Sequence, residues 1–129
     1  MFGPEPDDVL NSSQSSTITI TAGATVYSKA FSLRYGAYFS LSYIAASAGA
    51  IDLTIQLEQS YRLPTTEGSA DAAYVIPTTL PDIHTNLADE LQHHTAFSPV
   101  ALPYGRLKIV SAAGVTSTLI AKLNKQEDY

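Results

Sequence analysis

The residues most able to do chemistry gather in one segment, residues 82–94. The segment holds the chain's three histidines and three acidic residues: His84, His93, His94, Asp82, Asp89 and Glu90. A metal site would need several of these side chains to converge on one point, with further partners that orient each ligand. Adjacent histidines point about 100° apart on a helix and to opposite faces of a strand. The spacing from His84 also matches no metal-binding motif, so we expect a solvated histidine cluster, with no metal and no cofactor.

Other routes to catalysis are equally weak in this sequence. Serine is abundant, yet no serine lies in a G-x-S-x-G nucleophile elbow. Asp52 and Glu58 would stand on one face of a strand about 20 Å apart, which exceeds the separation of the two carboxylates in glycosidases. No glycine-rich phosphate loop is present. The sequence therefore predicts that the protein is not an enzyme.

The aromatic residues favour contact with protein. The chain has eight tyrosines and no tryptophan. Tyrosines on a β-sandwich can form a sugar-stacking platform, and tyrosine is also enriched in protein interfaces. Sugar platforms usually include tryptophan, so an interface is the favoured interpretation, although most of these tyrosines are expected to be half-buried strand residues.

Composition narrows the class of protein. At 129 residues one domain is expected, and only 15% of residues are charged, against about 25% in typical soluble domains. Seven basic and twelve acidic residues give a net charge of -5, which disfavours binding to nucleic acid phosphates. Cysteine is absent, so stability must come from packing or assembly. A charge-poor surface suits a protein that binds other protein.

Neither a membrane span nor a secretory signal is predicted. The first residues, MFGPEPDDV, lack the positive and apolar regions of a signal peptide. No apolar run approaches the roughly 18 residues that a membrane span needs. We expect a chain that is made in the cytoplasm and does not bind a membrane.

Alternating apolar and polar residues predict the strands. In the stretch IDLTIQLE, residues 51–58, the apolar residues point to one face and the polar residues, including Asp52, Thr54, Gln56 and Glu58, to the other. Residues 37–59 are expected to form a hairpin, with its turn at Ser47–Gly49. Strands are also predicted on both sides of a turn at 22–24, and a short one is predicted at 72–77. Two last strands, in PYGRLKIVSA and GVTSTLIAKLN, are expected to pair through a turn near Gly114.

The segment 77–94 is ambiguous. Ile83, Leu87 and Leu91 recur every four residues, and Pro81 suits the first turn of a helix. A short helix or a long loop with a brief strand would both fit. Together these patterns predict an all-β protein, an antiparallel β-sandwich or jelly roll of about seven or eight strands with little helix. An extended N-terminal arm over residues 1–16 would precede a single domain over residues 17–129.

Read together, four features resemble the cementing, or decoration, proteins of tailed bacteriophages. They are the polar arm, the stretch AYFSLSYIAASAGAIDLTIQLEQSY, the segment LADELQHH, and the ending PYGRLKIV…GVTSTLIAKLNKQE. The similarity spans about Thr25 to Glu127. It implies a structural virion protein of β-sandwich or jelly-roll type on the outer capsid surface. Its partner would be the major capsid protein, and self-association as a dimer or between neighbouring copies on the lattice is expected.

The arm and one loop are the expected contacts with the capsid. The residues concerned are Phe2, Pro4, Pro6, Val9, Leu10, Arg62, Leu63, Glu67 and Asp71. The polar strand face that includes Glu58 would meet solvent or a neighbouring copy. The alternative function is a receptor- or glycan-binding β-sandwich module of a phage tail or fibre. A hydrolase that uses the histidine segment is a further rival.

Overall fold

The computed structural model describes residues 5–8, 17–34 and 36–127. This described part contains ten strands and no helix, and so no helix that is long and apolar enough to cross a membrane. The strands are β1 (Glu5–Asp8), β2 (Thr17–Ile20), β3 (Thr25–Tyr27), β4 (Phe31–Ser32), β5 (Gly36–Ser47), β6 (Leu53–Ser60), β7 (His84–Leu87), β8 (His93–Phe97), β9 (Tyr104–Ser111) and β10 (Ser117–Glu127).

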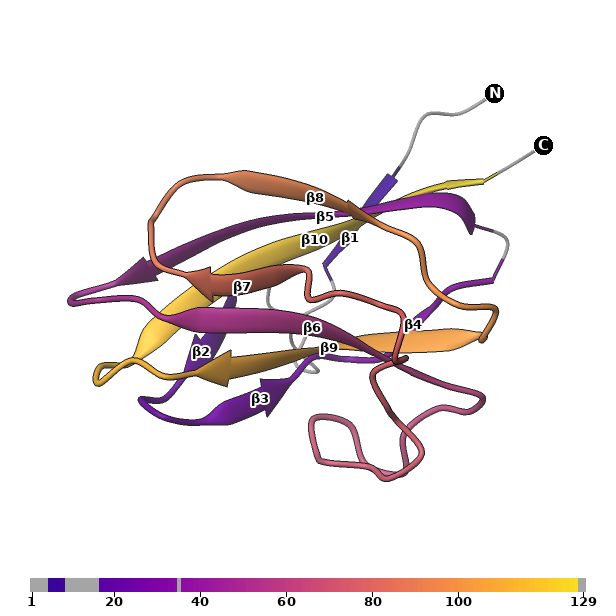
Figure 1. Ribbon diagram of the computed structural model, residues 1–129, viewed down its shortest axis with the longest axis horizontal. Helices are drawn as coiled ribbons and strands as arrows, with labels where there is room; N and C mark the ends of the chain where they lie inside the picture. Colours follow the sequence, from indigo (N-terminus) through magenta and orange to yellow (C-terminus); the bar gives the residue numbers. More distant parts are fainter. Residues whose placement is uncertain (1–4, 9–16, 35, 128–129) are drawn as a thin grey trace.

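The strands form two antiparallel sheets that pack face to face (Figure 1). In the first sheet, β1 and β2 pair with successive parts of β10, which is followed by β5 and then β8. In the second sheet, β3 and β4 pair with successive parts of β9, which is followed by β6 and then β7. β1 and β2 share one edge position and β3 and β4 share another, so the ten strands occupy eight positions, four in each sheet. Their order is that of a jelly roll. The predicted fold class is confirmed.

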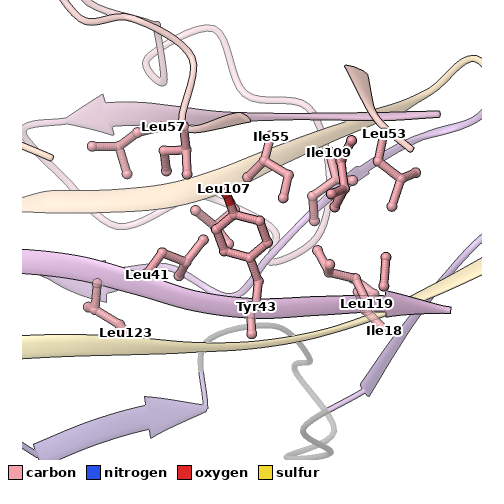
Figure 2. Close-up of a cluster of buried hydrophobic side chains, with 14 of the residues drawn as sticks. Ile18, Leu41, Tyr43, Leu53, Ile55, Leu57, Leu107, Ile109, Leu119 and Leu123 are labelled. Atoms are coloured by element: carbon pink, nitrogen blue, oxygen red, sulfur yellow. The ribbon is translucent and has the colours of Figure 1, made fainter. Parts of the chain in front are cut away.

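The core lies between the two sheets and follows from the alternation in the sequence. Along the middle of the four central strands every second residue points inward, and these side chains are almost completely buried. Figure 2 shows Leu41, Tyr43, Leu119 and Leu123 of the first sheet facing Leu53, Ile55, Leu57, Leu107 and Ile109 of the second. Burial of these apolar side chains is the main stabilising force, because the chain has no disulfide.

Both predicted hairpins are wrong. β5 and β6 span the predicted hairpin 37–59, but β5 pairs with β10 and β8, whereas β6 pairs with β9 and β7. β9 and β10 likewise lie in different sheets. Alternation places the apolar side chains of a strand on one face. Two such strands can then be neighbours in one sheet or can pack across the gap between two sheets. In this chain, β5 and β6 take the second arrangement, and so do β9 and β10.

The short helix considered within residues 77–94 does not form. β7 and β8 occupy this segment, in agreement with the alternative of a loop that carries strand. Ile83 and Leu87 are buried, but Leu91 is 66% exposed. Residues four positions apart also lie on the same face of a strand, so the spacing of Ile83 and Leu87 does not distinguish a helix from a strand. β7 is irregular, with a register shift against β6 and a φ of 54° at Asn86.

Two further strand predictions need correction, and the arm is described only in part. The strand predicted after the first turn is divided by residues 28–30 into β3 and β4, and the strand predicted at 72–77 is reduced to one bridge between Gln59 and Val75. Within the predicted arm, β1 pairs with Lys122–Lys125 of β10. Residues 1–4 and 9–16 lie outside the described residues, so the extended arm stays a prediction there.

Candidate docking surface

The outer face of the second sheet carries a buried ion pair. Glu58 on β6 lies opposite Arg106 on β9, and both side chains point away from the core. The Arg106 Nε atom donates a hydrogen bond of 2.9 Å to the Glu58 carboxylate, and both residues are buried. The polar strand face is therefore not simply exposed to solvent at this end.

A long loop between β6 and β7, residues 61–83, buries this pair, and we call it the covering loop (Figure 1). Arg106 Nη1 donates a 2.7 Å hydrogen bond to the carbonyl of Ser69 in the loop. The Arg106 guanidinium also lies 4.2 Å from the ring centre of Tyr27 and 4.6 Å from that of Tyr74. Cation–π contacts of this kind strengthen when water is excluded. The arginine thus attaches the loop to the sheet.

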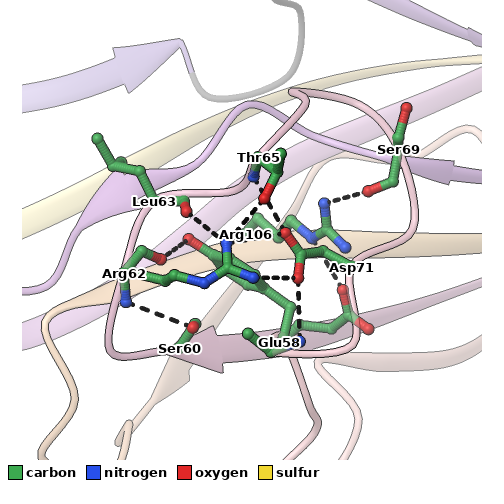
Figure 3. A network of polar contacts seen from close by, with 10 residues as sticks. Glu58, Ser60, Arg62, Leu63, Thr65, Ser69, Asp71 and Arg106 are labelled. Atoms are coloured by element: carbon green, nitrogen blue, oxygen red, sulfur yellow. Dashed lines mark hydrogen bonds and ion pairs between the residues drawn. The ribbon is translucent and has the colours of Figure 1, made fainter.

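A second ion pair organises the covering loop itself (Figure 3). Arg62 donates two hydrogen bonds to the two oxygens of Asp71, at 3.1 and 2.9 Å. The Asp71 carboxylate also accepts hydrogen bonds from the backbone N–H groups of Ala73 and Thr65. These two amides, and then Arg62, lower the pKa of Asp71 from 3.8 to about 2. The hydroxyl of Tyr74 donates a 2.6 Å hydrogen bond to the Arg62 carbonyl. The loop is therefore internally bonded along much of its length.

Three large apolar side chains are exposed on this bonded scaffold. Tyr61 is 69% exposed, and Leu63 and Val75 are each 55% exposed. The hydrogen bond between Tyr74 and Arg62 connects the two chain segments that carry them. Large exposed apolar side chains on an ordered loop can serve as anchors in a protein contact. We call Tyr61, Leu63 and Val75 the apolar loop residues.

The structure places the predicted contact residues unequally. Arg62 and Asp71 are brought together in the ion pair, and Leu63 is exposed beside them. Glu67 is exposed near the tip of the same loop. Pro6 lies in β1 at the edge of the first sheet. The other four predicted contacts lie outside the described residues: Phe2, Pro4, Val9 and Leu10.

Sequence reasoning missed the residues that hold the loop in place. Arg106 and Glu58 each occupy a polar position of an alternating strand, which predicts exposure. Their contact depends on the register of β9 against β6, with Glu58 opposite Arg106. Only the alternation was visible beforehand, and alternation does not specify a partner strand.

The histidine segment forms a compact polar cluster where the β7 and β8 edges of the two sheets meet. The Tyr43 hydroxyl is hydrogen-bonded to His84 Nδ1 at 2.6 Å and to Thr95 at 2.9 Å. His93 Nε2 is hydrogen-bonded to Asp89 at 2.8 Å, and its ring lies 4.8 Å from that of His84. Burial, and then the charge of His93, lower the pKa of His84. Burial is also the main cause of the raised pKa of Tyr43.

This cluster brings together side chains that the sequence placed in one segment, but it does not form a metal site. The described residues include no group of three or more histidine or acidic side chains that could hold a metal ion. His93 points inward to Tyr43, whereas His94 is exposed and bonded to Ser42 at 2.8 Å. The two adjacent histidines therefore face opposite sides of a strand.

Two cavities open beside Phe39, which lines both. They have volumes of about 480 and 450 Å³. Arg34 lines the first and Asp82 lines the second, so neither cavity brings two charged side chains together. A site for a specific small ligand normally combines an apolar wall with several convergent polar groups. In the second cavity the polar residues are Thr79, Asp82, Thr95 and Ser98, which do not specify one class of ligand.

The tyrosines whose side chains the structure describes do not form a flat aromatic surface. Tyr27 and Tyr74 contact Arg106, Tyr104 lies under Arg34, and Tyr43 is buried in the core. Within this described set, Tyr61 is the exposed one. A sugar-stacking platform would need several exposed rings together. The apolar loop residues are therefore the better candidate for a contact site. Comparison with protein-family models finds no match to the chain, and no curated protein matches it significantly.

Proposed function

We propose that this protein is a structural virion protein that binds the outer surface of a phage capsid and cements the lattice of major capsid protein subunits. The proposal combines the resemblance in sequence with one structural observation. That observation is the group of apolar loop residues, Tyr61, Leu63 and Val75, exposed on a loop that two arginine–carboxylate pairs hold in place. The major capsid protein is the partner, and the outer capsid surface is the location.

The physical basis is a preorganised contact. A loop that is already bonded to its own sheet loses little conformational entropy when it docks, so more of the contact energy appears as affinity. A protein that binds the assembled lattice better than free subunits stabilises the lattice by that difference in affinity. Many modest contacts repeated over a shell then add through multivalency.

The histidine cluster supports a role in structure more than one in hydrolysis. In this cluster the structure pairs His84 Nδ1 with the Tyr43 hydroxyl and His93 Nε2 with Asp89. Tyr43 is also bonded to both His84 and Thr95, and it bridges the edges of the two sheets. These hydrogen bonds favour a structural role, in which they hold the edges of the two sheets together.

The test is co-sedimentation of the full-length protein with expanded, undecorated phage heads. The variant Leu63→Asp places a charge among the apolar loop residues, and Leu91→Asp is the matched control. Leu91 is similarly exposed at 66% but lies in the connection between β7 and β8, at the opposite end of the sandwich (Figure 1). We expect saturable binding by the wild-type protein and the control, and about ten-fold or greater loss of affinity for Leu63→Asp.

The other outcomes have defined meanings. Equal binding by all three proteins would show that the covering loop is not the contact. The N-terminal residue Phe2 would then be substituted, because deletion of residues 1–16 would also remove β1 from its edge. If the protein binds no head preparation and forms a stable trimer, the alternative of a receptor- or glycan-binding module of a tail or fibre would replace our proposal.

A further inference from the structure

β8 is an edge strand with one unpaired side. It pairs with β5 from Phe39 to Tyr43 and ends the order of the first sheet, with no described strand beyond it (Figure 1). The free side of an edge strand presents backbone N–H and C=O groups that can pair with a strand of another molecule. Natural proteins usually block such edges with charges, prolines, bulges or very short strands.

The other three edges of the described sandwich are each blocked in this way. The β7 edge has a register shift and a residue at positive φ, Asn86. At the edge formed by β1 and β2, each of the two described strands has four residues, and β1 contains Pro6 and three acidic residues. The edge formed by β3 and β4 consists of strands of three and two residues, with Lys29 between them.

β8 has none of these features. Its five residues, HHTAF, pair with β5 in continuous register. No lysine, arginine, aspartate or glutamate occurs from Leu91 to Pro103. The exposed side chains of this strand are His94 and the small Ala96, and both lie on the outer face of the sheet.

We propose that β8 pairs antiparallel with β8 of a second copy of this chain across a two-fold axis. The distribution of acidic residues permits a second copy at this edge. Each chain carries a net charge of -5, so two copies repel each other most where acidic residues face each other and least along β8, which contains no acidic residue. Pairing would join the two first sheets into one continuous sheet.

Full overlap of the two strands specifies the register. Thr95 lies on the axis, His94 lies opposite Ala96 of the second copy, and His93 lies opposite Phe97 of the second copy. On the outer face, each histidine therefore meets a small residue. On the inner face, the ring of each His93 lies beside the ring of Phe97 of the second copy, and cross-strand pairs of aromatic residues are stabilising.

The contact is expected to be weak for a free dimer. Two five-residue strands bury less than the roughly 1,000 Å² that a stable interface needs. Association should therefore depend on concentration and become strong only where copies are held close together. The proposal concerns a different part of the molecule from the covering loop and does not depend on capsid binding.

The test uses sedimentation of the purified full-length protein over a concentration series. The variant His94→Lys/Ala96→Lys places like charges opposite each other at two points of the dimer. The matched variant His94→Glu/Ala96→Lys places opposite charges at the same two points. Both variants lose the bond between His94 and Ser42, so the loss of that bond cannot explain a difference between them.

We expect wild-type protein to move from monomer toward dimer as its concentration rises into the micromolar-to-millimolar range, because the interface is smaller than that of a stable complex. The dimer dissociation constant of the like-charge variant should exceed that of the opposite-charge variant by about ten-fold or more. Circular dichroism checks that both variants are folded. A wild-type protein that stays monomeric throughout, or two variants with equal association, would overturn the proposal. Because heads are absent, neither result bears on capsid binding.

Discussion

Replacing Glu58 with leucine should strongly destabilise the protein, because it leaves the Arg106 guanidinium buried without its counter-charge. Arg106 would keep one hydrogen bond, to the carbonyl of Ser69, and its contacts with Tyr27 and Tyr74. Removing one partner of a buried pair typically costs about 3–5 kcal/mol. For a domain of this size, that loss lowers the melting temperature by about 10–25 °C.

The companion variants separate the ion pair from simple packing. Arg106→Met should cost a similar free energy, because the Glu58 carboxylate then lacks its partner. The double variant Glu58→Leu/Arg106→Met removes both charges and keeps side chains of similar volume, so its stability should return to within about 1 kcal/mol of wild type. Losses of about 3–5 kcal/mol in each single variant and of about 1 kcal/mol or less in the double variant make the coupling between the two sites about 5 kcal/mol or more.

The assay is urea unfolding followed by far-UV circular dichroism, since the chain has no tryptophan. Equal slopes of the free energy of unfolding against urea would show that the variants unfold between comparable states. Lys108→Met is the control. Lys108 lies on the same outer face, two residues from Arg106, but is half-buried. Its substitution should change stability by about 0.5 kcal/mol or less. Additive losses in the double variant would refute the argument that the two charges depend on each other.

Three further predictions concern the loop, the histidine cluster and the core. The pKa of Asp71 is lowered, so its carboxylate stabilises the fold above its ordinary pKa of 3.8. This contribution is lost as pH falls from 3.8 through about 2. Over this range, the urea midpoint of Asp71→Asn should therefore change less than that of wild type. The pKa of His84 is lowered in the folded protein, so the unfolded chain binds a proton there more readily than the folded protein does. The free energy of unfolding of wild type should therefore decline as pH drops below about 6.5. If the urea midpoint of His84→Asn shows the same decline, another group is responsible. A methyl group at Gly105 would lie 3.1 Å from Leu33 and 3.3 Å from Leu57, so Gly105→Ala should cost about 1–3 kcal/mol; Gly114→Ala, whose added carbon meets nothing within 4 Å, serves as its control in the same urea experiment.

The candidate site could be predicted only in part. The loop that carries Arg62, Leu63 and Asp71 was predicted to be a contact segment, whereas the ion pair between Arg62 and Asp71 was not predicted. The contact between Glu58 and Arg106 joins residues 48 positions apart. It exists because β6 and β9 are neighbours in one register and because the covering loop excludes water above them. No local pattern records either condition.

By itself, the sequence determined which residues of each strand face the core. Leu53, Ile55 and Leu57 are buried as their alternation predicts, because successive side chains of a strand point to opposite sides. The tertiary structure decided which strands are partners. Alternation has the same form whether two strands are hydrogen-bonded neighbours or face each other across the core, and this chain uses the second arrangement for β5 with β6 and for β9 with β10. The same ambiguity concealed the burial of Arg106, since a polar residue on an outer face is exposed unless a distant part of the chain folds over it.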